Sequence, residues 1–256
     1  MIEYVFMRLV RRMIPERVLK RIQFLIPYYS SSLGEINSSA IVEEYMQYCS
    51  SVKGKCVLEL GCGATNGTGY GFVLKGVRKW WGYEPFQKFY RRLDNTQREL
   101  LESKYHKSVE QNAVERIQTM EKIPKNSVDL IVSNSVLEHV ANCEELFSRC
   151  SNVLKPGGKM VHKIDYRDHF FKYPFHFLTF SKALWDRYLN PGDLHRYRIS
   201  DHLESMENAK FKARCLTRKC DREKYELVRT KIHEDFKKYS EDDLMTTMAI
   251  IEARLQ

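Results

Sequence analysis

A glycine-rich turn directly after a short apolar segment, within residues 56–69, is the feature that most constrains this fold. The apolar segment predicts a buried strand, and the pattern after the turn predicts a helix. Glycine permits positive φ angles and lets a ligand approach the backbone closely. The turn has three glycines within seven residues, at positions Gly61, Gly63 and Gly67. The sequence therefore predicts a ligand-binding loop between a strand and a helix.

Two carboxylates indicate what kind of ligand the loop holds. Glu59 stands just before the turn. A phosphate gains nothing from an anion there, whereas a ligand with an amino group and a positive charge is attracted to it. Glu84 follows the next predicted strand, where a carboxylate can accept hydrogen bonds from both hydroxyls of a ribose. Together the two acids favour S-adenosylmethionine over a nucleotide phosphate.

Strand and helix patterns alternate along the chain after position 39. We expect helices at 39–50, 86–104 and 137–154, and a further helix that follows the glycine loop and ends within 71–76. We expect strands at 56–60, 78–83, 127–134, 159–164, 208–218 and 245–255, with a weak one between 105 and 117. This alternation predicts a mostly parallel sheet covered by helices on both faces, with the ligand beyond the carboxyl ends of the strands.

Residues 1–27 carry apolar side chains at helical spacing, with arginines and lysines on the other faces and a break at Pro15. One interpretation is a basic amphipathic helix that lies on an anionic membrane surface. The other is a helix that packs on the core or covers the active site. We expect residues 1–39 to form an N-terminal helical extension and residues 40–256 to form the main domain.

The composition excludes several classes of protein. The formal net charge of +9 over 256 residues fits an anionic partner, and it fits equally a charge that only maintains solubility. The seven cysteines include no CxxC pair, so no metal site is expected. No apolar run of about eighteen residues and no secretion signal is found. We therefore expect a cytoplasmic protein, with the inner face of the membrane as a further location.

Three runs of the sequence resemble motifs of the class I S-adenosylmethionine-dependent methyltransferases, in a similar order and spacing. They are the first motif at 57–63, the fourth strand and following helix at 128–140, and the turn into the fifth strand at 154–159. The resemblance covers about residues 53–168. It implies a Rossmann-like α/β fold with a mostly parallel seven-stranded sheet, and it identifies residues 40–256 as the methyltransferase domain.

The resemblance also implies which residues hold the cofactor. In this family the glycine turn passes under the methionine part, the first acid helps to organise binding, and the second acid binds the ribose. Thr65 stands where the family commonly has a glycine, so the turn is expected to be longer or differently shaped. The implied cofactor-binding residues are Glu59, Gly61, Cys62, Gly63, Gly67, Glu84, Asn134 and, as the adenine contact, Glu115.

Two other functions are consistent with the same fold. A nicotinamide dinucleotide binds through GxGxxG, but here Asn66 replaces the third glycine and no obvious Tyr-Lys pair is available for hydride transfer. A non-catalytic module would use the basic face to bind RNA or a protein. The intact acids and the two early glycines argue against such a module.

The methyl acceptor is expected beside the polar residues that follow the fourth and fifth strands. Methyl transfer requires alignment of the acceptor and exclusion of water, and a base is needed only where the acceptor loses a proton. The catalytic candidates are His139, His169 and Asp165, with Asp168 nearby, and the substrate-binding candidates are Glu138, Arg167 and Arg196. As alternatives, Glu138 and His139 cap a helix or pack over the cofactor, and the arginines form structural ion pairs.

The fourth strand lacks the patterns of nucleobase methyltransferases. It ends in Ser133-Asn134-Ser135-Val136 rather than in an Asn/Asp-Pro-Pro-aromatic run, and it has no Pro-Cys pair. Nucleic acid is therefore disfavoured as the acceptor. Residues 164–169, with the aromatic residues that follow, resemble a bacterial subgroup of the family. The resemblance implies transfer to an oxygen or nitrogen atom of a small-molecule or glycan-like acceptor.

Overall fold

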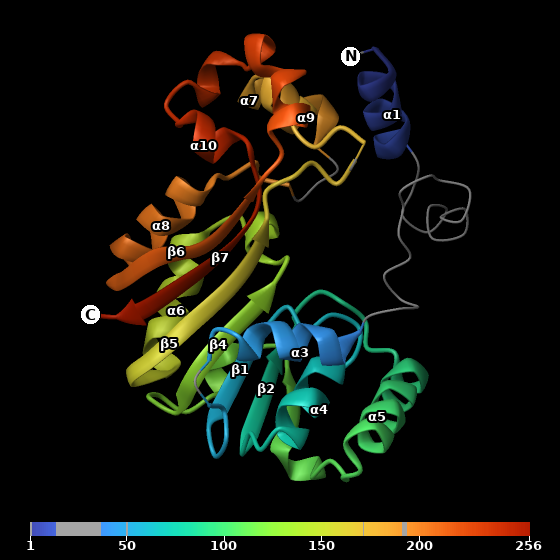
Figure 1. Cartoon of the computed structure of the whole chain (residues 1–256), viewed down its shortest axis with the longest axis vertical. Coiled ribbons are helices and arrows are strands. Elements are labelled where there is room, and N and C mark those ends of the chain that lie inside the picture. Colours follow the sequence, from blue (N-terminus) through green and yellow to red (C-terminus); the bar gives the residue numbers. More distant parts are fainter. Residues whose placement is uncertain (1, 14–36, 50, 171, 191–193) are drawn as a thin grey trace.

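The computed structural model describes residues 2–13, 37–49, 51–170, 172–190 and 194–256. They form a seven-stranded sheet with the order β3-β2-β1-β4-β5-β7-β6 and helices on both faces (Figure 1). The strands are β1 Cys56–Leu60, β2 Lys79–Tyr83, β3 Val114–Ile117, β4 Val128–Asn134, β5 Leu154–Asp165, β6 Phe211–Cys220 and β7 Thr246–Leu255. The expected strands are thus confirmed, and the weak third one is the four-residue β3.

The directions and order of the strands indicate where a ligand crevice lies in this sheet. β1 pairs in parallel with β2 on one side and β4 on the other, and β3 and β5 continue the parallel sheet. Only β7 runs antiparallel, between β5 and β6. The strand order therefore reverses between β1 and β4, and in open α/β sheets ligands bind beyond the carboxyl ends of the strands at such a point.

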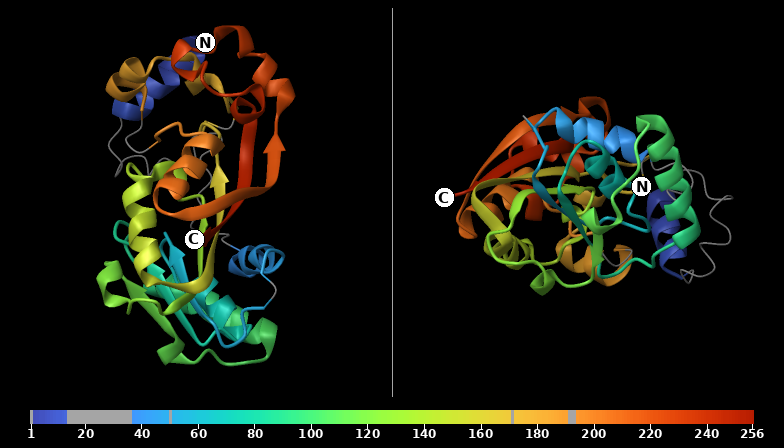
Figure 2. Two further views of the ribbon diagram at one scale, coloured as in Figure 1. Left: turned by 90° about the vertical axis from the view of Figure 1, so that its left-hand side faces the viewer. Right: turned by 90° about the horizontal axis from the view of Figure 1, so that it is seen from below.

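The two faces of the sheet are covered by different helices (Figure 2). One face carries α3 Ser38–Met46, α4 Gly67–Leu74 and α5 Arg91–Tyr105, and the other carries α6 Cys143–Val153 and α8 Ile199–Asn208. Side chains alternate between these layers, so that Val57 packs in the α3–α4 layer while Leu58 packs in the α6–α8 layer. The central strands are buried on both sides, as expected for parallel strands.

A third group of buried residues lies beyond the carboxyl ends of β4 and β5 and forms a region we call the cap (Figure 1). The cap comprises residues 2–13, 173–190, 194–195 and 221–245. Its helices are α1 Ile2–Met13, α7 Lys182–Leu184, the π-turn η6 Trp185–Leu189, α9 Arg222–Glu226 and α10 Glu241–Leu244. Three 3₁₀ turns also belong to it: η5 His176–Thr179, η7 Arg229–Lys231 and η8 Glu234–Phe236. Its core is rich in aromatic side chains, including Tyr4, Phe175, Phe177, Trp185 and Phe236.

Helix α1 belongs to this cap. Tyr4 and Arg8, one helical turn apart, are almost fully buried against it. The first half of the expected N-terminal helical region is therefore confirmed as a helix, and it packs on the protein. The expected second helix after Pro15 and most of the expected loop lie outside the described residues. A domain boundary at residue 39 remains a prediction.

Two helices differ from the sequence expectation. The helix expected at 86–104 begins only at Arg91, because the Glu84 carboxylate accepts the backbone N–H groups of Phe86 and Gln87 and holds that segment in a turn. The helix expected at 137–154 is divided into a 3₁₀ turn, η4 Leu137–His139, and α6. Asn142 causes the break, because its side chain accepts from the Glu145 N–H and caps α6. None of the described helices is both long and apolar enough to span a bilayer.

Candidate active site

The glycine loop follows β1 at the point where the strand order reverses. Gly61 and Gly63 both have φ of +67°, a conformation that glycine adopts at no steric cost. A Cβ atom on Gly61 would lie 2.5 Å from Cγ2 of Val136, so this residue packs directly under the segment after β4. A Cβ atom on Gly63 would meet nothing closer than the Gln87 Oε1 atom, at 4.0 Å. The loop is therefore tightly packed against Val136 at Gly61, whereas the space next to Gly63 is empty of protein atoms.

The second half of the loop is held by α5. The Thr65 hydroxyl donates to Oε1 of Gln97 at 2.6 Å, and the Asn66 backbone N–H donates to Oδ1 of Asp94 at 2.6 Å. Helix α4 then begins at Gly67, where a Cβ atom would lie 2.2 Å from the Ser38 hydroxyl. Hydrogen bonds to α5 thus fix the shape of the turn at Thr65 and Asn66.

Glu59 is buried beneath this loop, on the α3–α4 side of the sheet. Only 5% of the residue is exposed, and its Oε2 atom has no hydrogen-bond partner in the described part of the chain. Burial raises the pKa of Glu59 to about 8, an effect that the side chains of Trp80 and Thr68 oppose. The carboxyl group thus has unused acceptor capacity next to the glycine loop.

Glu84 organises the neighbouring turn at the end of β2. Its Oε2 atom accepts the Gly63 backbone N–H at 3.0 Å, and Oε1 accepts the N–H groups of Phe86 and Gln87, each at 3.0 Å. The residue is buried. An ionised carboxylate has about four acceptor positions. Three are used here, so Glu84 links the two loops and retains capacity for one further donor.

Arg116, which the sequence analysis did not single out, also holds the loop. Its Nη2 atom donates to the Gly63 carbonyl at 2.5 Å, and Nη1 donates to Sγ of Cys62 at 3.1 Å. Its neighbour Glu115, the predicted adenine contact, pairs with Lys79 at the start of β2, with 2.8 Å between Nζ and Oε2. Successive residues of a strand point to opposite faces, so Arg116 and Glu115 lie on different sides of β3.

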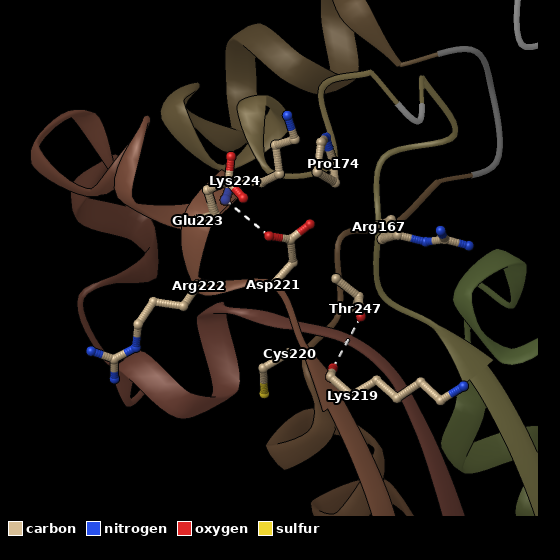
Figure 3. Close-up of a pocket in the computed structure, with 9 residues that line it drawn as sticks. All are labelled: Arg167, Pro174, Lys219, Cys220, Asp221, Arg222, Glu223, Lys224 and Thr247. Carbon is tan, nitrogen blue, oxygen red and sulfur yellow. Dashed lines mark hydrogen bonds between the residues drawn. The ribbon is translucent and has the colours of Figure 1, made fainter.

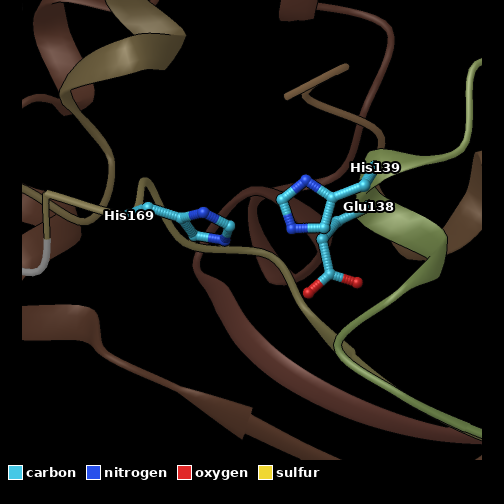
Figure 4. Close-up of side chains that lie close together, drawn as sticks. All are labelled: Glu138, His139 and His169. Carbon is cyan, nitrogen blue, oxygen red and sulfur yellow. The ribbon is translucent and has the colours of Figure 1, made fainter. Parts of the chain in front are cut away.

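Beyond β4, three side chains converge. Glu138 and His139 lie on the turn η4, and His169 follows β5; one ligand-type atom from each lies within 4.8 Å of the others (Figure 4). The two imidazole ring centroids are 4.9 Å apart. Asn134, the predicted cofactor contact, ends β4 just before this turn. The structure thus brings together three of the predicted site residues from two strand ends.

Glu138 is the unusual member of this group. It is 3% exposed, and neither of its carboxylate oxygens has a hydrogen-bond partner among the described residues. Burial raises the pKa of Glu138 to about 8; the charge of His139 opposes this rise and that of Asp165 adds to it. Two other segments fix the turn that carries it, because the Glu138 carbonyl accepts from His195 N at 3.4 Å and His202 Nε2 lies 3.4 Å from the Leu137 carbonyl.

Asp165 and Arg167, predicted as a catalytic and a substrate-binding residue, form an ion pair with each other. The Arg167 Nη2 atom lies 2.6 Å from Oδ2 of Asp165, and Nε lies 2.9 Å from Oδ1. The geometry is bidentate, and this pairing raises the pKa of Arg167. The carboxylate is therefore occupied by the guanidinium, which is itself partly exposed at the carboxyl end of β5.

Two further candidates have structural partners in or beside the cap. Arg196 is buried, and its Nη1 atom donates to the carbonyls of Phe177 and Phe180 at 2.8 and 2.7 Å. Asp168 is fully buried, forms an ion pair with Arg8 of α1 and accepts the Tyr4 hydroxyl. Arg196 thus has a structural role through backbone carbonyls rather than through an ion pair, and Asp168 is held in a structural ion pair with Arg8.

A separate open pocket of about 490 Å³ lies where β5, β6 and β7 meet the cap (Figure 3). Its lining includes Arg167, Lys219, Asp221 and Thr247. In Figure 3 the Arg167 and Lys219 side chains extend away from Asp221, whose carboxylate lies near the centre of the view. Neither the glycine loop nor the group of Glu138 and the two histidines lines it, so this pocket is distinct from the crevice at β1 and β4.

Comparisons with known proteins agree with this geometry. A family model described as "Methyltransferase domain" matches residues 58–162, which span the glycine loop, β4 and most of β5. A curated relative, the ubiquinone biosynthesis O-methyltransferase of Bradyrhizobium diazoefficiens, is 25% identical over 186 residues, covering 67% of this chain and 68% of that protein.

Solved structures with the same fold include two further methyltransferases. Phosphoethanolamine N-methyltransferase 2 of Haemonchus contortus has a TM-score of 0.54 at 16% identity, covering 87% of this chain and 53% of that chain. Geranyl diphosphate C-methyltransferase of Streptomyces coelicolor A3(2) has a TM-score of 0.51 at 17% identity, covering 88% of each chain. Both likenesses concern the fold.

Proposed function

The chain is a class I S-adenosylmethionine-dependent methyltransferase, and we propose that it transfers the methyl group to an oxygen or nitrogen atom of a small-molecule or glycan-like acceptor. The observation that carries the proposal is the arrangement at the switch point. Buried carboxyl groups with unused acceptor capacity, those of Glu59 and Glu138, flank a glycine loop whose upper side is open at Gly63.

The residues around the loop fit the cofactor. The cofactor is a cation, and a buried acid such as Glu59 is better solvated in its ionised form when a positive group is nearby. The remaining acceptor position of Glu84 suits a ribose hydroxyl, and the space above Gly63 admits a ligand against the backbone. When bound, S-adenosylmethionine supplies an electrophilic methyl group on sulfur. Cys62, Gly67, Asn134 and Glu115 remain proposed contacts.

The acceptor atom is inferred from this chain's own residues, because related proteins differ in it. The proteins compared above are named as O-, N- and C-methyltransferases. Here His139 and His169, beside Glu138, are positioned after β4 and β5 to assist removal of a proton from the acceptor. Oxygen and nitrogen acceptors carry such a proton. Arg167, partly exposed at the carboxyl end of β5, suits an acidic group on the acceptor.

Helix α1 supports a peripheral contact with the inner face of a membrane. With Tyr4 and Arg8 turned to the cap, the helix exposes an apolar stripe: Ile2, Phe6, Leu9, Val10 and Met13. Such a stripe has the spacing of an amphipathic helix that lies in a bilayer interface. The sequence adds five basic residues at positions 11–21, which favour an anionic surface.

The transferase proposal is tested by incubating the full chain with methyl-labelled S-adenosylmethionine and matched panels of phenols, amines, sugar acids and short RNAs. We expect formation of S-adenosylhomocysteine with labelled small acceptors, and a loss of this product with the Gly61→Arg variant. Label transfer to RNA alone would contradict the proposed acceptor class. Absence of cofactor binding would contradict the transferase itself.

The membrane proposal needs point variants, because deleting α1 would leave the buried Asp168 without Arg8. We expect the full chain to cosediment with vesicles containing phosphatidylserine, and the Phe6→Glu/Met13→Glu variant to remain in solution. Lys182→Glu on the exposed side of the cap is the matched control for charge. Equal sedimentation of all three proteins would contradict a contact through the α1 stripe.

A further inference from the structure

We propose that Glu138, His139 and His169 bind one divalent transition-metal ion at the acceptor side of the crevice. The three side chains come from η4 and from the segment after β5, and their ligand atoms already lie within 4.8 Å of one another (Figure 4). The absence of CxxC pairs led us to expect no metal site. This site instead uses two adjacent residues and a third one strand later, so no cysteine spacing reveals it.

The carboxylate of Glu138 supplies an independent observation. It is almost fully buried, and both oxygens lack a hydrogen-bond partner among the described residues. A buried polar group without a partner is unfavourable, and buried charges in proteins are paired or coordinate metals. The neighbouring acid Asp165 is already paired with Arg167. A cation between Glu138 and the two imidazoles would satisfy the carboxylate.

The ligand set selects the kind of ion. Imidazole nitrogen suits Zn²⁺ and Fe²⁺, whereas Mg²⁺, Ca²⁺ and Mn²⁺ prefer oxygen ligands. Ligand atoms of such ions lie about 2.0–2.2 Å from the metal, so the half-buried imidazoles must rotate slightly to close on it. Three protein ligands leave at least one coordination position open, as in catalytic rather than structural metal sites.

The surroundings hold the ligands in place. The η4 turn is fixed through its carbonyls, those of Leu137 and Glu138, which contact His202 and the His195 backbone. The loop that carries His169 is fixed by the neighbouring Asp168, which is paired with Arg8 and accepts the Phe170 N–H at 2.9 Å. Rigid support of this kind is what a metal site needs in order to bind without large rearrangement.

The chemical role of the ion rests on the proposed function. An acceptor hydroxyl that occupies the open position has a lowered pKa and releases its proton to water. The resulting oxygen anion donates an electron pair to the methyl carbon, so that an O–CH₃ bond forms. The S–CH₃ bond breaks, and its electron pair stays on sulfur to give S-adenosylhomocysteine. In this scheme the histidines assist removal of the proton as ligands of the ion, and water rather than an imidazole takes up the proton.

The test is a titration of the metal-free full chain with Co²⁺, Zn²⁺, Mn²⁺ and Mg²⁺. We expect one equivalent of Co²⁺ to bind and give a visible absorption band from mixed nitrogen and oxygen ligands. Zn²⁺ should displace Co²⁺, and Mg²⁺ should bind much more weakly. The variants His139→Asn, His169→Asn and Glu138→Gln should each weaken Co²⁺ binding about 10- to 100-fold or more.

His106→Asn is the matched control. His106 is an exposed residue in the left-handed conformation at the end of α5, a conformation that asparagine tolerates well. We expect this variant to bind Co²⁺ as the wild type does. Unchanged Co²⁺ affinity in the three site variants, or equal loss in His106→Asn, would overturn the site.

A second readout separates this site from the transferase assignment. Binding of S-adenosylhomocysteine is measured with and without Zn²⁺, and it should persist in the metal-free protein. If the cofactor binds but Co²⁺ does not, the metal site is wrong and the transferase proposal stands. If Co²⁺ binds and the cofactor does not, the metal site stands and the transferase proposal is wrong.

Discussion

The two ends of the crevice differ in how completely their polar groups are paired. At the cofactor end, Glu84 accepts three backbone N–H groups, Arg116 donates to the loop, and Asp94 holds Asn66. At the acceptor end, the buried Glu138 has no partner among the described residues. The cofactor loop is therefore preformed by the chain's own hydrogen bonds, whereas the acceptor end retains a buried carboxyl group with unused acceptor capacity.

The largest effect is expected from the glycine loop. Gly61→Arg should lower the affinity for S-adenosylhomocysteine by about 100-fold or more, because even a Cβ atom would lie 2.5 Å from Val136. Gly63→Ala is the sharper variant, since its Cβ would enter space that is empty of protein. Calorimetric titration measures both affinities.

For Gly63→Ala we expect a small loss of thermal stability from the positive φ and a clear loss of affinity. Circular dichroism checks that the fold remains. Wild-type affinity in a folded Gly63→Ala protein would mean that the space above this glycine is not where the cofactor lies.

A variant at the acceptor end should lower the reaction rate without lowering the affinity for the cofactor. His169→Asn should lower kcat by about 10²- to 10⁴-fold, the usual contribution of a group that assists proton removal. The affinity for S-adenosylhomocysteine should stay close to that of the wild type, because His169 lies with Glu138 and His139 after β4 and β5. A parallel loss of cofactor affinity would show that the two ends are not independent.

The cap should be destabilised without damage to the cofactor loop. Arg8→Ala removes the partner of the fully buried Asp168, and leaving such a charge unpaired costs about 3–5 kcal/mol. Urea unfolding measures this loss. The double variant Arg8→Met/Asp168→Asn, which removes the charge as well, should recover part of the stability. A loss below about 1 kcal/mol for Arg8→Ala would mean that the pair does not hold α1.

Glu59 is the exception at the cofactor end, because its Oε2 atom has no hydrogen-bond partner among the described residues. Its raised pKa predicts that the stability of the fold depends on pH. The unfolded carboxyl group releases its proton near its ordinary pKa of 4.5, and the folded one releases it at about 8. Between these values the folded state binds more protons, so the free energy of unfolding should fall as pH rises from about 4.5 to 8. Its contribution is on the order of a few kcal/mol.

Urea unfolding of the cofactor-free protein at several pH values measures this trend. The Glu59→Gln variant should show a smaller decline than the wild type, because the amide does not titrate, whereas Glu138, whose pKa is also raised to about 8, still contributes. An identical pH dependence in both proteins would assign the effect to other groups. Saturating S-adenosylmethionine should also reduce the decline in the wild type, if its positive charge stabilises the ionised carboxylate.

Local sequence determined the features that the sequence analysis placed correctly. Glu59 lies near the end of an apolar strand segment, and the glycine turn and Glu84 follow such segments directly. Their positions at strand ends could therefore be read from neighbouring residues. The same is true of Glu138 and His139, although the break before α6 was missed. That break depends on one Asn142 side chain that caps the helix.

Features that depend on distant contacts could not be read in this way. Asp168 was expected to face the methyl group, but its partner Arg8 lies in the first helix. In the four-residue β3, the alternation that turns Arg116 toward the glycine loop is too short to be recognised in advance. The cap core joins segments from both termini and the middle of the chain. The spacing of apolar residues within one segment does not indicate which distant segments it packs against.

Calorimetric titration of the wild-type full chain with S-adenosylhomocysteine and, separately, with NAD tests the central claim most directly. A preformed cofactor loop predicts one S-adenosylhomocysteine bound per chain, no measurable heat with NAD, and loss of binding in Gly61→Arg. Absence of S-adenosylhomocysteine binding, or tighter binding of NAD, would contradict the account.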